Sequence, residues 1–177
     1  MRAWLPVPGT TTGRLIAAAL TQFGAHGFAG VNVADIAREA GVTTGALYHH
    51  FGSKTALWGI VRADVEQRVL DRIEGAAAVV PARSLAELAP AILVGFDYLV
   101  RTEYARLLAE PAHPDVAIDE PDDDRVANLI DNLLHDTGAT VGPYAAAAWR
   151  AALLRSTRGS HESATARAGL ERLLTGR

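Results

Sequence analysis

Hydrophobic residues recur along this chain at the α-helical period of about 3.6 residues, and the two-residue alternation of half-buried strands is almost absent. Along the predicted helix 54–77, for example, apolar side chains follow one another at four-residue intervals: Leu57, Val61, Val65, Val69 and Ile73. Glycine, proline and capping residues divide the whole sequence into about nine such helices. We therefore predict an all-α protein, whose 177 residues are enough for one large domain or two small ones.

The segment Val31–Lys54 has the sequence VNVADIAREAGVTTGALYHHFGSK and predicts two short helices joined by a tight turn. Asn32 is a capping residue for the first helix, and Thr43 or Thr44 caps the second. Gly41 stands where the chain must reverse, because glycine tolerates positive φ. Four side chains can point inward together: Ile36, Val42, Leu47 and Phe51. In a helix-turn-helix of this kind, the second helix enters the major groove of DNA with its N-terminal residues at the base edges.

The outward residues of the second helix suit contact with DNA. Small residues let the backbone approach the groove floor, a threonine methyl can touch a thymine methyl, and a lysine beside helix N–H groups can bind a phosphate. The predicted DNA-contacting residues are Asn32, Thr43, Thr44, Gly45, Ala46, Tyr48, His49, His50 and Lys54. A helix pair of this kind can also be plain packing, with Tyr48 serving as a core aromatic, and this alternative stays open.

The pattern G-F-x-x-V-N-V-x-x-I-A-x-x-A-G-V-T-x-G-A-L-Y-H-H-F-x-S-K-x-x-L resembles the N-terminal domain of tetracycline-repressor (TetR) family transcriptional regulators. The resemblance covers roughly residues 12–60. It implies DNA contact at positions matched by Thr44, Gly45, Tyr48, His49 and Lys54. It further implies a homodimer whose helical body binds a small effector, and whose last two helices form a four-helix bundle with those of the partner.

Three residues depart from the family pattern. Gln22 stands where an apolar residue is usual, and Val31 replaces a common small hydroxyl residue. Ala46 replaces the longer polar side chain with which some members contact bases, so the operator sequence is not predictable.

The predicted organisation has three parts. Residues 1–11 form a flexible arm, residues 12–57 form the DNA-binding domain with its helix-turn-helix at about 32–51, and residues 58–177 form a helical domain for effector binding and dimerisation.

A single recognition helix reads only a few base pairs, so we expect a homodimer that presents two such helices about 34 Å apart. The predicted dimer interface consists of Ala145, Ala148, Ala152, Leu153, Leu170, Leu173 and Leu174. An effector pocket is expected among Phe96, Tyr98, Leu99, Tyr104, Leu108 and Trp149, with an apolar or aromatic ligand that shifts the population between two states. The same side chains can instead simply fill the core of one protomer.

The distribution of charge along the chain, and the absence of enzyme and metal-binding motifs, restrict the functions that the sequence allows. The net charge is −3, but residues 1–54 carry four basic and two acidic side chains, so a weakly basic head precedes an acidic body. The chain has no cysteine, no G-x-S-x-G, no phosphate-binding glycine loop and no H-E-x-x-H, so we expect no enzyme, no cofactor and no metal site. Its apolar runs are too short for a membrane span.

We therefore expect a cytoplasmic, ligand-responsive repressor that binds a palindromic DNA operator as a homodimer. The alternative is a helical protein-interaction module without specific DNA binding.

Overall fold

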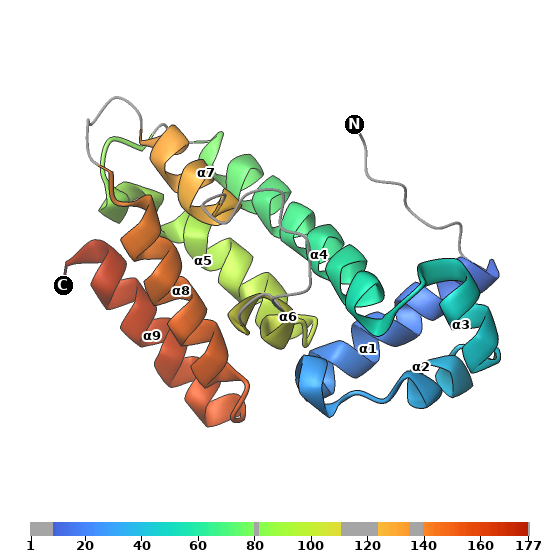
Figure 1. Ribbon diagram of the computed structural model, residues 1–177. Helices are drawn as coiled ribbons and strands as arrows, with labels where there is room; N and C mark the ends of the chain where they lie inside the picture. The colour runs from blue at the N-terminus through green and yellow to red at the C-terminus, as the bar shows by residue number, and fades with distance from the viewer. Residues whose placement is uncertain (1–8, 80–81, 111–123, 135–139, 177) are drawn as a thin grey trace.

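The computed structural model describes residues 9–79, 82–110, 124–134 and 140–176, and these form nine α-helices and no strand (Figure 1). The prediction of an all-α chain is confirmed. The helices are α1 (Thr11–Gly30), α2 (Val33–Glu39), α3 (Thr44–Phe51), α4 (Lys54–Ala77), α5 (Leu85–Arg101), α6 (Ala105–Ala109), α7 (Arg125–Leu133), α8 (Gly142–Ser156) and α9 (Ser160–Thr175). Most of the predicted arm, residues 1–11, lies outside the described residues.

Helices α1 to α3 and the first turn of α4 form a small unit at one end of the molecule, residues 9–58, which we call the head (Figure 1). Its core consists of fully buried side chains from all four helices: Leu15, Phe23, Ile36, Leu47, Leu57 and Trp58. Gln22, a departure from the family pattern, donates to Glu39 over 2.6 Å and so ties α1 to α2 at the surface. The head is therefore held by its own apolar core.

Helix α4 begins in the head and continues, with no break, into the remaining described residues, which we call the body (Figure 1). Its observed bounds are those predicted from the four-residue apolar spacing. Asp64 and Arg68, one turn apart, form an ion pair of 2.5 Å. Because one helix crosses the predicted domain boundary at residue 57, the head and the body share a rigid element.

Helix α5 contains a proline. Pro90 predicts a kink, or a turn before a separate helix from Ala91; one helix runs from Leu85 to Arg101 through the proline, so the alternative of a separate helix is wrong. Ser84 caps it by accepting from the Glu87 N–H, and apolar residues on most sides of the helix are buried. Tertiary packing thus outweighs the backbone hydrogen bond that the proline removes.

Helices α8 and α9 pack side by side along the edge of the body (Figure 1). The start of α8 is fixed by Asp131 of α7, which accepts hydrogen bonds from the Val141 and Gly142 N–H groups over 2.9 and 2.7 Å. A side chain on Gly142 would collide with the backbone of Ala127, so this crossing requires glycine. None of the described helices combines the length and the apolar character needed to cross a membrane.

Candidate nucleic-acid interface

The turn between α2 and α3 is built by local capping. Asn32 accepts a hydrogen bond from the Ala34 N–H over 2.9 Å and starts α2. Gly41, at φ 67°, ends it and lets the Val42 N–H return to the Ala37 carbonyl over 2.9 Å. Thr43 then caps α3. The sequence therefore fixes this turn without help from the body.

Helix α3 presents two distinct faces. Leu47 and Phe51 are buried in the head, whereas Thr44, Gly45 and Tyr48 are exposed, Tyr48 to 50%. The exposed face continues through His49 and His50, and Thr43 precedes it on the surface; Ala46 is half-buried. A short helix with an anchored inner face and small or hydrogen-bonding residues outside has the form needed to enter a DNA groove.

The two capping side chains retain only part of their hydrogen-bonding capacity. The Asn32 Oδ1 atom is used by the Ala34 N–H, and the Thr43 Oγ1 atom accepts from the Ala46 N–H over 3.2 Å. The Asn32 amide and the Thr43 hydroxyl still offer donor hydrogens. Both residues are thus suited to donate to phosphate oxygens rather than to accept from bases.

Lys54 stands at the first turn of α4, but its side chain is not fully extended into solvent. Its Nζ atom lies 4.4 Å from the centre of the Phe28 ring, and partial burial lowers the pKa of the amine. Phe28 in turn contacts Trp58 edge-on, with ring centres 5.6 Å apart. Aromatic residues of the head therefore position the ammonium group beside the N-terminus of α4.

Sequence reasoning missed Thr12. Its hydroxyl lies 3.5 Å from Nδ1 of His50, so the start of α1 borders the exposed face of α3. No local signal in the sequence reveals this, because the two residues meet only once the head has folded. Among the described residues, no group of three or more histidine or acidic side chains is arranged to hold a metal ion.

The residues predicted for an effector pocket contribute to the core of the body. Phe96, Tyr98, Leu99, Leu108 and Trp149 are at most 5% exposed, and Tyr104 is half-buried. The Arg72 guanidinium lies 3.8 Å from the centre of the Tyr98 ring. A cavity of about 460 Å³ is instead lined by other residues, at the junction of head and body.

The residues predicted for a dimer interface divide between core and surface. Five are buried within the protomer: Ala145, Ala152, Leu153, Leu170 and Leu174. Ala148 is half-buried and Leu173 is 71% exposed. The five buried side chains pack inside one protomer, and Ala148 and Leu173 are the members of the predicted set that reach its surface.

Head and body are joined at a second point besides α4. Near its C-terminal end, α1 is kinked at Gly27, which has φ 68° and ψ 178°, and the next N–H, that of Phe28, donates to the Glu110 carboxylate over 3.2 Å. Arg62 of α4 donates to the carbonyls of Leu107 and Glu110, the latter over 2.9 Å, and desolvation lowers the pKa of its guanidinium. The end of α6 is thus hydrogen-bonded to both α1 and α4.

An exposed second helix on a compact three-helix head defines a helix-turn-helix protein. Residues 15–58 match the family of bacterial regulatory proteins described as the tetR family. The HTH-type transcriptional regulator BetI of Agrobacterium fabrum is 51% identical over 43 residues, which are 24% of this chain and 21% of that protein. The HTH-type transcriptional regulatory protein RaaS of Mycobacterium tuberculosis is 50% identical over 48 residues, 27% of this chain and 22% of that protein. Over this segment the chain is similar to the tetR family, as the residue pattern predicts.

The matched segments span about a fifth of the length of these two relatives. The likeness over the whole chain is one of fold. The fatty acid degradation regulator FadR from Bacillus halodurans superposes with a TM-score of 0.71 at 19% identity, covering 93% of this chain and 98% of that chain. The head is therefore similar in sequence and fold to known regulators, and the body in fold.

Proposed function

We propose that this protein is a DNA-binding transcriptional regulator that inserts α3 into the major groove of an operator. The observation that carries the proposal is the division of α3 into a buried face, at Leu47 and Phe51, and an exposed face that begins with Thr44 and Gly45. Small residues at the start of this helix allow the backbone to approach base edges, and Tyr48 and Lys54 are placed to donate to phosphates. The relatives BetI and RaaS, which match the head, are themselves transcriptional regulators.

The proposed active form is a homodimer on a palindromic operator, acting as a repressor in the cytoplasm by occluding the site. One α3 helix reads too few base pairs for specificity, and two related by a twofold axis read two half-sites. Exposed apolar side chains on α8 and α9 support a partner there, since Tyr144, Leu154 and Leu173 are 79%, 44% and 71% exposed. We assign the interface to the outer surfaces of these two helices.

Release from DNA is proposed to follow the binding of a small effector. An effector acts only if it binds the DNA-incompetent state more tightly than the competent one. The contacts of Glu110 with Phe28, and of Arg62 with the end of α6, give a physical route from the body to the head.

The test is a selection of genomic DNA fragments by the purified protein at two salt concentrations. A regulator is expected to enrich one palindromic sequence and to bind it far more weakly at the higher salt, because phosphate contacts release counterions. His49→Ala is expected to change the selected bases, whereas His161→Ala, a matched exposed histidine on α9, is expected to leave them unchanged. A protein-interaction module would enrich no sequence, and that result would overturn the proposal.

A further inference from the structure

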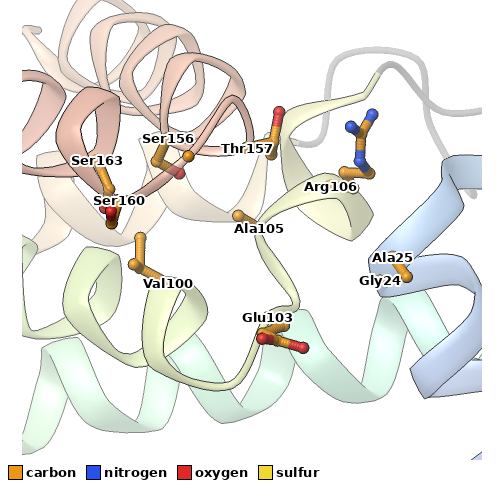
Figure 2. Close-up of a pocket in the computed structure, with 11 residues that line it drawn as sticks. Gly24, Ala25, Val100, Glu103, Ala105, Arg106, Ser156, Thr157, Ser160 and Ser163 are labelled. Carbon is orange, nitrogen blue, oxygen red and sulfur yellow. The ribbon is translucent and has the colours of Figure 1, made fainter.

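The cavity at the junction of head and body has walls from both units. Figure 2 shows Gly24 and Ala25 of α1 on one side, the serine and threonine residues around the turn between α8 and α9 on the other side, Ala105 and Arg106 of α6 between them, and Val100 and Glu103 below. Its volume of about 460 Å³ lies within the range of small-molecule sites, about 300–1,000 Å³. Any molecule bound here would touch the head and the body at once.

One wall of this cleft is rich in hydroxyl groups from the ends of two helices. Ser156 and Thr157, at the end of α8, donate to the Leu153 and Leu154 carbonyls over 2.7 and 2.8 Å, which leaves their oxygen lone pairs as acceptors. Ser160 and Ser163, at the start of α9, make no side-chain hydrogen bond to any described residue. The wall therefore offers both donors and acceptors to a polar ligand.

The opposite wall carries charge. Arg106 of α6 lines the cleft, and its Nη1 atom is 3.5 Å from the Glu110 Oε1 atom, a long and partly exposed ion pair. Glu103, at φ 62°, forms the turn before α6, and its carbonyl oxygen would lie only 2.6 Å from a Cβ atom on Gly24. Head and body are thus in close contact at one edge of the cleft, where the Arg106 guanidinium is held by a single long ion pair.

We propose that this cleft binds a small polyhydroxy carboxylate, whose carboxylate pairs with Arg106 and whose hydroxyl groups bond to the serine and threonine wall and to Glu103. The inference rests on the proposed function, because it places the effector site at this junction and assigns a hydrophilic rather than an apolar effector. A bound carboxylate competes with Glu110 for Arg106, and Glu110 is the group that accepts from the Phe28 N–H at the kink of α1. Binding therefore alters the contact that fixes the head on the body.

Calorimetric titration of the full chain with three probes tests the ligand class. D-gluconate carries both kinds of group, D-glucitol keeps the hydroxyl groups without the charge, and hexanoate keeps the carboxylate without the hydroxyl groups. Gluconate is expected to bind at least about tenfold more tightly than either of the others, because only it makes both sets of contacts. If gluconate binds no more tightly than glucitol or hexanoate, the inference is overturned.

Two variants locate the site. Ser163→Phe fills the cleft and is expected to abolish the heat of gluconate binding, whereas Ala164→Phe, on the exposed side of the same helix, is expected to leave it unchanged. Arg106→Gln is expected to weaken gluconate by about tenfold and glucitol hardly at all, since it removes one charged hydrogen bond. Gluconate binding that is equal in the wild type and in both cleft variants would place the ligand elsewhere and overturn the assignment. If Ser163→Phe fails to fold by circular dichroism, the Arg106→Gln titration decides.

Operator binding without ligand is measured in parallel, so that two failures can be told apart. Specific DNA binding by the wild type together with no gluconate binding refutes the cleft assignment and leaves the proposed regulator intact. Gluconate binding without specific DNA binding refutes the proposed function.

Discussion

The head and the body use their apolar and polar residues in different ways. In the head, the eight residues of α3 form a buried apolar face and an exposed polar face, and the exposed face is the one proposed to contact DNA. In the body, α5 buries nine of its seventeen residues, and its aromatic side chains serve packing. The cleft is lined by polar residues that were not among those predicted for a pocket, such as Ser163 and Arg106, and not by the predicted aromatic residues. In both regions the proposed sites therefore consist of residues that are not used in the hydrophobic core.

The largest expected effect separates the two faces of α3. Leu47→Ala should lower the free energy of unfolding by about 2–5 kcal/mol, because it deletes a fully buried side chain and leaves a cavity. Tyr48→Ala should change that free energy by less than about 0.5 kcal/mol, as exposed substitutions do, and yet weaken operator binding strongly. Urea unfolding followed by circular dichroism, with a DNA titration of each variant, measures both. If Tyr48→Ala destabilises the fold as much as Leu47→Ala, the division into two faces does not hold.

The second prediction concerns the junction of head and body. Gly27→Ala should cost about 1–3 kcal/mol, because an alanine cannot easily adopt φ 68° with ψ 178°, and its Cβ atom would collide with the Glu110 carboxylate. Gly75→Ala in α4 is the matched control, since no atom lies within 4 Å of the position that the new methyl group would take, and helix propensity favours alanine by up to about 1 kcal/mol. Both values come from urea unfolding. Equal stability of the two variants would show that the kink is not held as described.

A smaller effect is expected at the edge of the recognition surface. Lys54→Ala should weaken binding to all DNA sequences to a similar extent and reduce the slope of log affinity against log salt by about 1, because it removes one phosphate contact. Fluorescence anisotropy with specific and random duplexes over a series of salt concentrations measures this. Loss of binding to the specific duplex alone would instead assign Lys54 to base recognition.

The smallest expected effect is a pH dependence inside the body. Burial on its own raises the pKa of Asp124, but hydrogen bonds from Arg150, over 2.5 and 2.7 Å, and from the Ala127 N–H outweigh it, so the pKa lies below its ordinary value. A carboxyl group with a lowered folded-state pKa stabilises the fold above its unfolded-state pKa and loses this contribution as the pH falls through the folded value. The melting temperature of the wild type should therefore exceed that of Asp124→Asn most at neutral pH, and the difference should shrink between about pH 5 and pH 2. A difference that stays constant over this range would show that the ion pair does not stabilise the body.

Sequence reasoning succeeded where the signals are local. The capping residues Asn32, Thr43 and Ser53 and the glycines of the turns define helix ends, and the bounds of α4 follow from the Ser53 cap and the apolar spacing. At Pro90 it left two alternatives, and the turn before a separate helix is wrong, because packing against neighbouring helices maintains one helix through the proline.

The limits of the site prediction have the same physical origin. The exposed face of α3 follows from the period of one short helix, whereas Thr12 reaches that surface only through the packing of α1 on α3. Leu153 and Leu170 have the composition expected of an interface, but the same composition fills a core, and periodicity alone does not distinguish a partner helix in the same chain from one in a second copy. The cleft combines residues from five helices and the turns between them, so no short pattern signals it.

Cleavage of DNA from a reagent attached to α3 tests the central claim most directly. The chain has no cysteine, so Gly45→Cys provides a single attachment point for an iron chelate on the exposed face, where a Cβ atom makes only ordinary contacts. The account predicts two clusters of cuts in the selected palindrome, centred about one helical turn or about 34 Å apart, and none from the same reagent at Gly75→Cys, at the end of α4 that lies away from the head. Cuts of equal strength from both positions, or no cuts from α3 while the protein is bound, would contradict it.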